Sequence, residues 1–487
     1  MSELPLLEGV LKYVREKNIS FCMPGHKGGR GFLNTPVGKN FAQDFLKCDI
    51  TEVEGVDNLH NPEGIIQEAS ILLSNYYGSK KSYFLVNGST SGNLIMIFSS
   101  FNEGDKVIVD RNCHKSVFNA IIMRKLQPVY IKSIVSERLN TSLAIDLEDF
   151  LNVLHDNKDA KGIIITYPSY YGTCSNLEYV IGQGKKFNMR ILVDSAHGAH
   201  FGANNNLPKS AIKLGADMVV TSAHKTIASL TQTAYLHVNN GQDIKNSDFY
   251  FSIFSSTSPS YLLLCSMDYA RFYLEKYGEL DYERLLKLVY YYKNKINKLK
   301  GIHIVDKADI EHINKEIFRE KKCKDFKFIS DLDETRYIIS LDKGYSGHLF
   351  LSYLRNSGIQ AEMSDNSNVV LIFSPFNKES EFKKLYEVLK SCDLDKLKSN
   401  NIKLIHCNIP EAILTPYEAM NKNKEYVNLK DSLGRVSAEN IVPYPPGIPI
   451  LTMGELINQN CLEAIYHYLS YKVDVLGITD NKIQVVM

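Results

Sequence analysis

Two short segments of this chain, Val-Asp-Ser-Ala-His at residues 193–197 and Ser-Ala-His-Lys-Thr at residues 222–226, indicate the kind of fold it adopts. Each comes at the end of an apolar run, 190–194 or 217–221, that has the length and composition of a buried strand. Both segments are therefore expected at strand carboxyl ends, which is where α/β sheets build ligand sites.

Asp194 and Lys225 are the chemistry-bearing residues of these segments. An acid at such a sheet edge can pair with the protonated pyridine nitrogen of a cofactor, and a lysine can form a Schiff base with an aldehyde. Either residue alone is more simply explained, the acid as a helix cap and the lysine as a solvated side chain. Together, with His197 and His224 beside them, they favour a pyridoxal phosphate (PLP) site.

A third segment, Asn-Gly-Ser-Thr-Ser-Gly-Asn at residues 87–93, stands between an apolar run and an apolar helical pattern. Backbone amides at a helix N-terminus, together with the hydroxyls of Ser89, Thr90 and Ser91, can bind a phosphate dianion. Ordinary helix capping by these hydroxyl residues is the alternative. Because the segment precedes Asp194 and Lys225 in sheet order, we interpret it as the phosphate-binding part of the site.

Two histidines are expected near the same edge. His114 follows the predicted strand 106–110, so its imidazole could stack on the cofactor ring and meet the reacting substrate, or could simply be hydrogen-bonded in a loop. His197 could orient the Asp194 carboxylate or contact the ring, and the sequence leaves both roles open.

The order of elements predicts an α/β fold, because short apolar runs alternate with helical patterns from about Pro62 to Val238. A helix is expected to start at Pro62 and to end at Gly78. Such alternation is typical of a mostly parallel sheet with helices on both faces. The predicted strands are 106–110, 128–133, 162–167, 190–194, 217–221 and 233–238.

The rest of the chain changes character in steps. Long helical patterns follow Pro259, and a polar, lysine-rich stretch at 307–327 is predicted to be a surface connection. A smaller α+β unit is then expected, with strands at 337–341 and 369–373 and helices near 346–356 and 378–391. A proline-rich stretch and a closing helix near 455–471 come last. The predicted domains are an N-terminal arm at 1–61, a PLP-binding major domain at 62–290, a small α+β domain at 291–395 and a C-terminal domain at 396–487.

Composition narrows the classes of function. With 56 basic and 55 acidic residues the net charge is +1, so no long-range field favours nucleic acid or anionic lipid. The apolar runs are far shorter than the ~20 residues that span a bilayer, and the opening residues lack the features of a signal peptide. The nine cysteines show no C-x-x-C spacing, which argues against zinc and fits a reducing cytoplasm. The expected partners are a small-molecule substrate and further copies of the chain.

The chain resembles the bacterial ornithine/lysine/arginine decarboxylase family, which has the aspartate-aminotransferase-like PLP fold (fold type I). The resemblance implies a large, mostly parallel seven-stranded sheet domain, a smaller α+β domain and a C-terminal domain. It covers nearly the whole length, through seven ordered stretches: 23–29, 49–62, 87–91, 194–200, 222–226, 256–261, and 434–439 followed by 443–447.

Residue roles follow from the resemblance. It implies Lys225 as the Schiff-base lysine, Asp194 on the pyridine nitrogen and His114 against the ring. It also implies phosphate contacts from Ser89, Thr90 and Ser91, with Ser222 and His224 adding to the cup, and with Thr257 and Ser258 reaching in from a neighbouring subunit. The active sites would then be shared between subunits.

Two departures from the family pattern matter. Larger members carry an N-terminal response-regulator-like domain, for which no room precedes the His-Lys-Gly-Gly motif at 26–29, so we expect a homodimer or homotetramer. Relatives usually have Pro-Gly-Glu where this chain has Met453, Gly454 and Glu455. A basic substrate needs carboxylates at the far end of its pocket, and Glu439 and Glu455 are the candidates, each of which could instead lie on a solvated turn.

The activity implied is PLP-dependent α-decarboxylation of a basic amino acid, first of all L-arginine to agmatine and carbon dioxide in polyamine biosynthesis. Lysine and ornithine are the alternative substrates. An aminotransferase or β-lyase on the same fold, or a catalytically silent regulatory relative, are the alternative classes. A transaminase would commonly need an arginine for the α-carboxylate, for which Arg336 and Arg355 stay open.

Overall fold

A seven-stranded sheet forms the centre of the computed structural model, which describes residues 3–321, 327–399, 408–444, 447–471 and 473–487. The strands from β10 to β4 are parallel, whereas β11 is antiparallel to both of its neighbours. The predicted α/β class and the mostly parallel seven-stranded sheet are thus confirmed. In spatial order the strands are β2 (Lys81–Leu85), β11 (Ala234–Val238), β10 (Met218–Thr221), β9 (Arg190–Asp194), β7 (Gly162–Thr166), β3 (Lys106–Asp110) and β4 (Gln127–Ile131).

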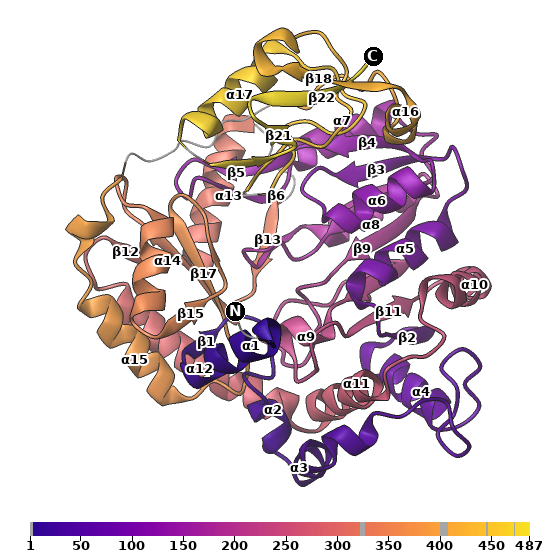
Figure 1. Ribbon diagram of the computed structural model, residues 1–487, viewed down its shortest axis with the longest axis vertical. Helices are drawn as coiled ribbons and strands as arrows, with labels where there is room; N and C mark the ends of the chain where they lie inside the picture. The colour runs from indigo at the N-terminus through magenta and orange to yellow at the C-terminus, as the bar shows by residue number, and fades with distance from the viewer. Residues whose placement is uncertain (1–2, 322–326, 400–407, 445–446, 472) are drawn as a thin grey trace.

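The interior positions of the central strands are apolar because helices cover the sheet on both sides (Figure 1). In β9, for example, Ile191, Leu192 and Val193 are fully buried. All six predicted strands are present, each within two residues of its predicted ends. The seventh strand, β2, is the apolar run that precedes the 87–93 segment.

Two helices that flank the sheet show why their ends lie where they do. Helix α4 (Ile65–Tyr77) begins three residues after Pro62, because the Asp57 carboxylate accepts hydrogen bonds from the amides of Gly64 (2.8 Å) and Ile66 (2.9 Å). It ends at Gly78, as predicted, where φ is +77°. Helix α5 (Gly88–Ser100) packs closely on the sheet through Gly92, where a Cβ would lie 2.7 Å from a methyl group of Leu85.

The small α+β unit follows helices α11 (Tyr261–Tyr273) and α12 (Glu279–Ile296). Its predicted strands and helices are confirmed. They are β12 (Ile302–Ile304), β14 (Arg336–Leu341), β17 (Asn368–Ile372) and β16 (Met363–Ser364), in that order, with α14 (Gly347–Asn356) and α15 (Glu379–Lys390).

The predicted surface connection at 307–327 is wrong for its described part, which is helix α13 (Lys307–Lys321). Lys307 and Lys315 are exposed, whereas Ile310, Ile313 and Ile317 form a buried stripe. The high lysine content hid the helical spacing of these three isoleucines. Residues 322–326 lie outside the described part of the chain.

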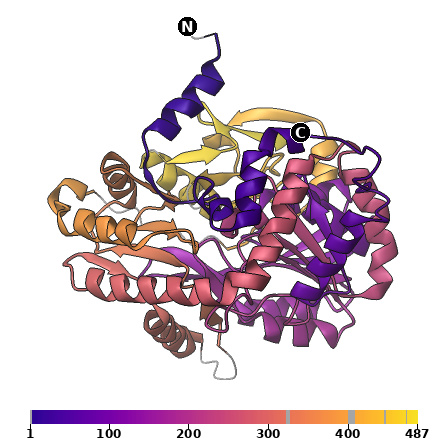
Figure 2. The ribbon, with the colours of Figure 1, turned by 90° about the horizontal axis from the view of Figure 1, so that it is seen from below.

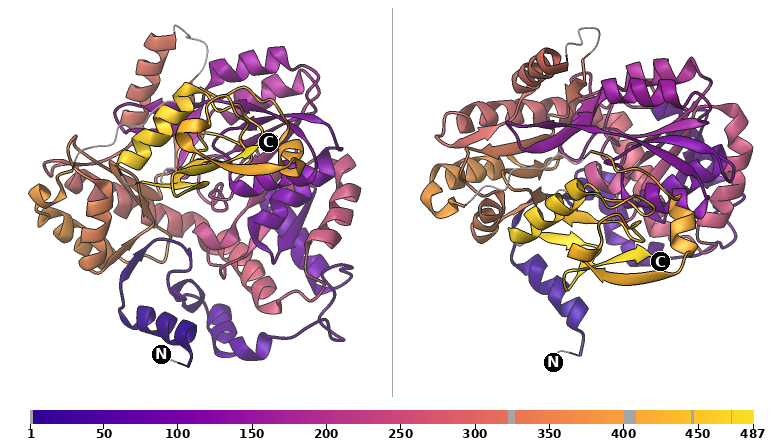
Figure 3. Two further views of the ribbon diagram at one scale, coloured as in Figure 1. Left: turned by 45° about the horizontal axis from the view of Figure 1, so that its top comes forward. Right: turned by 90° about the horizontal axis from the view of Figure 1, so that it is seen from above.

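The C-terminal unit has its own apolar core and lies at the top of Figure 1, next to the sheet domain; Figure 3 shows it from two further sides. It contains β18 (Lys424–Asn428), β22 (Lys482–Val486), β21 (Ile478–Thr479) and the closing helix α17 (Gln459–Ser470). At the other end of the chain, α1 (Pro5–Arg15) projects from the body (Figure 2) and buries none of its residues. Among the described helices, none has both the length and the apolar character needed to cross a membrane.

Candidate active site

Neighbouring strands bring the predicted residues to one edge of the sheet. Lys225 lies on the short helix α9 (Ala223–Thr226) directly after β10, and Asp194 is the last residue of the adjacent β9. His114 follows β3, which is separated from β9 only by β7. The sequence therefore located this edge correctly, and the tertiary structure supplies the contacts within it.

Lys225 is half-buried, and its Nζ lies 3.0 Å from Nε2 of His197. Burial lowers the pKa of the Lys225 amine, and this outweighs the carboxylates of Asp194 and Glu362, which raise it. A lowered pKa increases the fraction of neutral amine, which is the form that attacks an aldehyde. The environment of Lys225 thus suits Schiff-base chemistry.

Asp194 is held rigidly, with 3% of its surface exposed. Its Oδ2 accepts a hydrogen bond from Nδ2 of Asn93 (2.8 Å), and its Oδ1 accepts one from the Ala196 amide (3.1 Å). Asn93 also donates to Oγ of Ser116 (2.8 Å), so the amide is fixed from both sides. Each carboxylate oxygen keeps a lone pair for a further donor, such as a protonated ring nitrogen.

Asn93 is a site residue that the sequence analysis did not single out. It is the last residue of the 87–93 segment and lies on the face of α5 that packs against the sheet. This position in the 87–93 segment was the signal by which the sequence could have identified Asn93 as a site residue. Its partner, however, is 101 residues further along the chain.

The segment predicted to bind phosphate forms the N-terminus of α5. Asn87 precedes the helix without capping it through its side chain, and Gly88 has φ of +74°, so the first amides are left without a side-chain acceptor. Ser89 is half-buried and Thr90 exposed, whereas Ser91 is buried and donates to the Gly88 carbonyl (2.9 Å).

A second contribution comes from the Lys225 segment. Oγ of Ser222 is completely buried and has no hydrogen-bond partner in the described part of the chain. A buried hydroxyl without a partner at a ligand-binding edge indicates a bound group that completes it. With the α5 amides, the Asp194 carboxylate and the Lys225 amine, the donor set fits PLP.

The three histidines differ in their surroundings. His114 caps α6 (Lys115–Met123), and its Nδ1 lies 2.7 Å from Oγ of Ser116. Part of the residue is exposed to solvent. The partial burial of its ring lowers the pKa of His114, although the Asp194 carboxylate raises it. His224 bonds the Thr233 carbonyl through Nδ1 (2.9 Å). His197 is buried, and burial with the charge of Lys225 lowers its pKa well below the usual range, so its ring is neutral.

The N-terminal segment 23–29, which the resemblance included without a role, braces the Lys225 loop. The Gly25 amide donates to the His224 carbonyl (2.8 Å). A Cβ on Gly25 would lie 2.5 Å from the Ile227 carbonyl oxygen, so only glycine allows this approach. The motif therefore positions the backbone that carries Lys225.

The two arginines that could have bound an α-carboxylate are both engaged within the protein. Arg336 is fully buried, donates to Oδ2 of Asp333 from Nε (3.0 Å) and Nη2 (2.7 Å), and donates from Nη1 to the Tyr170 carbonyl (3.0 Å). Arg355 pairs with Glu16 at the surface. Both guanidinium groups are thus already paired with carboxylates of the chain.

Three of the predicted site residues, Thr257, Ser258 and Glu439, lie outside this edge of the sheet. Thr257 and Ser258 are exposed in the loop between α10 (Ile244–Phe254) and α11, and their phosphate role from a neighbouring subunit stays a prediction. Glu439 is half-buried, and no side chain of the described residues pairs with its carboxylate. Its role in substrate binding also stays a prediction.

Glu455 differs from the expectation. Both of its oxygens accept from Arg111, at 2.5 Å from Nη1 and 2.8 Å from Nη2, and both side chains are almost completely buried. We therefore assign Glu455 a structural role, in which it neutralises Arg111 and joins the C-terminal unit to the end of β3. The sequence could not reveal this, because the partners are 344 residues apart.

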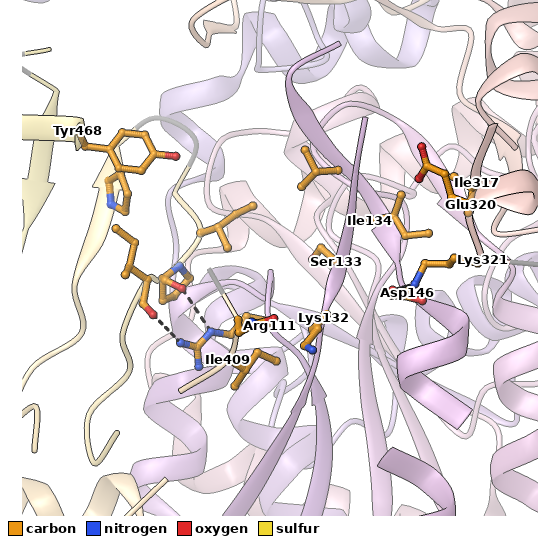
Figure 4. A pocket seen from close by; sticks show the side chains of 16 residues that line it. Arg111, Lys132, Ser133, Ile134, Asp146, Ile317, Glu320, Lys321, Ile409 and Tyr468 are labelled. Atoms are coloured by element: carbon orange, nitrogen blue, oxygen red, sulfur yellow. Dashed lines mark hydrogen bonds and ion pairs between the residues drawn. The ribbon is translucent and has the colours of Figure 1, made fainter. Parts of the chain in front are cut away.

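Arg111 also forms one wall of a cavity of about 290 Å³ between the sheet domain, α13 and the C-terminal unit (Figure 4). Charged groups of both signs line it, among them Lys132, Asp146 and Lys321. Lys225 and Asp194 do not line this cavity. It is distinct from the sheet edge described above.

Comparisons with known proteins identify the family of the chain. Residues 4–381 match the family model described as "Orn/Lys/Arg decarboxylase, major domain", and residues 400–475 match the model of the C-terminal domain of the same family. The chain is 34% identical to an arginine decarboxylase of Halalkalibacterium halodurans, over 98% of this chain and 96% of that protein. It is 32% identical to an arginine decarboxylase of Bacillus subtilis, over 99% and 97%. The solved structure of the Escherichia coli constitutive lysine decarboxylase superposes with a TM-score of 0.77 at 21% identity, over 99% of this chain and 82% of that chain.

Proposed function

Because the chain belongs to the Orn/Lys/Arg decarboxylase family and is a PLP-dependent amino acid decarboxylase, we propose that its substrate is L-arginine, which it converts to agmatine and carbon dioxide. The observation that carries the proposal is that Asp194 and Lys225 lie at the carboxyl ends of adjacent strands, in a chain about one-third identical to arginine decarboxylases over almost its full length.

Each residue of the site has a definite task. When bound, PLP supplies an electron sink for the bonds at the substrate Cα. Lys225 would provide the amine that binds the aldehyde, and its lowered pKa increases the fraction of that amine in the reactive neutral form. Asp194, fixed by Asn93, would hold a positive charge on the ring nitrogen, and the α5 amides with Ser222 would hold the phosphate. Lys225 or a neighbouring histidine can return a proton to Cα.

An aminotransferase is disfavoured by the arginines. A transaminase commonly holds the substrate α-carboxylate with a guanidinium, whereas in this chain Arg336 makes four hydrogen bonds to Asp333 and to the Tyr170 and His197 carbonyls. Decarboxylation, in contrast, requires that the α-carboxylate be able to leave. An α-carboxylate without a firm cationic anchor suits that reaction.

The substrate can be tested directly. Release of carbon dioxide is measured in parallel from arginine, lysine and ornithine with added PLP, and agmatine formation is checked by mass spectrometry. We expect arginine to give the highest kcat/KM. A preference for lysine or ornithine would correct the substrate, and no release from any of the three would refute the decarboxylase function.

We also propose a homodimer or homotetramer with shared active sites, which acts in the cytoplasm in polyamine biosynthesis. The exposure of Thr257 and Ser258 supports a role for them toward another subunit. The cysteines within the described residues are all free thiols, which fits a reducing compartment. Light scattering of the holoenzyme measures the oligomeric state. The shared site is tested by mixing the inactive Lys225→Ala and Thr257→Ala variants, which should restore activity if each site takes residues from two subunits.

A further inference from the structure

A chain of contacts leads from the small unit to Lys225. Glu362, which lies between β15 (Ile359–Ala361) and β16, accepts a hydrogen bond at Oε1 from the hydroxyl of Tyr170 (2.6 Å). The Tyr170 ring packs against the imidazole of His197, with ring centroids 4.6 Å apart. His197 in turn contacts Nζ of Lys225 at 3.0 Å.

The two ends of this chain of contacts belong to different parts of the fold. Tyr170 lies in the loop after β7, on the sheet edge that carries Lys225, whereas Glu362 belongs to the small unit. Oε2 of Glu362 accepts from the amide of Met23 in the N-terminal segment (2.8 Å). One carboxylate therefore ties the sheet domain, the small unit and the N-terminal segment together beside the active site.

The backbone around Tyr170 is fixed separately from its hydroxyl. Arg336 donates to the carbonyl oxygens of both Tyr170 (3.0 Å) and His197 (3.4 Å), which fixes these two main-chain segments relative to each other. These main-chain contacts do not involve the hydroxyl bond to Glu362. That bond instead sets the tilt of the Tyr170 ring, and through that ring the position of the His197 imidazole.

We propose that Glu362 and Tyr170 form a positioning pair that holds the His197 imidazole against Lys225. This inference rests on the proposed decarboxylase function for its kinetic consequences, although its geometry does not. His197 needs such support because its Nδ1 is buried and makes no hydrogen bond in the described part of the chain. In the described part of the chain, the contact with Lys225 and the packing of the Tyr170 ring both restrain the imidazole.

The pair also brings a negative charge close to the amine. After burial, which lowers the pKa of Lys225, and Asp194, which raises it, Glu362 is the next group and raises it further. The pKa of His224 is affected in the same direction by Glu362. Glu362 is thus expected to act on Lys225 in two ways, through the position of His197 and through its charge.

The test uses Glu362→Gln and Tyr170→Phe, which remove the charge and the hydroxyl while keeping size. Tyr171→Phe is the matched control, because Tyr171 also donates from a buried hydroxyl to a carboxylate, Oδ2 of Asp365 (2.6 Å), but is not part of the contacts to Lys225. Kinetics are measured on the holoenzymes with arginine. In the cofactor-free proteins, the pH dependence of Lys225 acetylation is followed by peptide mass spectrometry.

We expect both variants to lower kcat by about 10- to 100-fold with less than about threefold change in KM. The double variant should lose little more than either single one, because both changes break the same bond. Glu362→Gln should also shift Lys225 acetylation to lower pH, and Tyr171→Phe should leave kcat and this titration near wild type.

The proposal is overturned if both variants keep the wild-type kcat. It is also overturned if their losses in kcat are no larger than that of Tyr171→Phe and the Lys225 titration is unchanged. Its failure can be distinguished from failure of the proposed function. If the wild-type enzyme decarboxylates none of the three amino acids, the acetylation measurement on cofactor-free protein still decides whether Glu362 acts on Lys225. Tyr170→Phe, as the milder change, covers the case in which Glu362→Gln does not fold.

Discussion

Replacing Glu455 by glutamine should destabilise the attachment of the C-terminal unit rather than weaken substrate binding. The carboxylate makes two charge-assisted hydrogen bonds to Arg111, and the two side chains are 2% and 5% exposed. Removal of one partner from a buried ion pair leaves the other charge uncompensated, which costs about 3–5 kcal/mol. Arg111 keeps its bonds to Thr452 and to the Pro449 and Ile450 carbonyls, so we expect a loss near the lower end of this range.

Urea unfolding followed by circular dichroism measures this loss. With a denaturant slope of about 2–3 kcal/mol per M, a loss of ~3 kcal/mol lowers the midpoint by about 1 M or more. Glu425→Gln is the control, because Glu425 pairs with Arg435 at the partly exposed surface of the same unit and such pairs contribute only about 0–1 kcal/mol. Arg111→Met combined with Glu455→Leu should recover much of the loss, since no buried charge is then left unpaired.

The reasoning is refuted if Glu455→Gln lowers the midpoint no more than Glu425→Gln does. If, in addition, the folded variant shows a large increase in KM for arginine at unchanged stability, Glu455 is a substrate ligand after all. Kinetics and unfolding are therefore measured on the same preparations.

Four further outcomes are expected. Lys225→Ala should fold but form no yellow adduct with PLP. Asp194→Ala should bind the cofactor less well and lose most activity. Full turnover by either variant would contradict the role assigned to that residue. Gly25→Ala should shift the Lys225 loop and weaken PLP binding at least about tenfold, whereas Gly9→Ala, with no atom within 4 Å of the added carbon, should be neutral when both are titrated with PLP. Burial lowers the pKa of His237 to about 3. Between that value and about 6.5 the unfolded chain therefore binds more protons than the folded one, and stability falls as the pH is lowered. The urea midpoint should decrease between pH ~7 and pH ~5, and it should decrease less in His237→Asn.

Much of the site could be predicted because its chemistry lies at the ends of strands. An apolar run of five residues identifies a buried parallel strand, and the next few residues must then lie at the carboxyl edge of the sheet. This reasoning holds for Asp194, for His114 and for Lys225, whose positions depend only on local pattern and on the order of the strands. The helix at 307–321 was missed for a local reason too, since its charge concealed its apolar stripe.

The partners of these residues depend on the tertiary structure alone. Asn93 and Asp194, Arg111 and Glu455, and Tyr170 and Glu362 are separated by 101, 344 and 192 residues. No periodicity links such positions, because their contact results from how helices and domains pack rather than from the conformation of either segment. The sequence by itself determined which strands exist and which reactive groups follow them, whereas packing determined that Glu455 neutralises an arginine and that Glu362 lies beside Lys225.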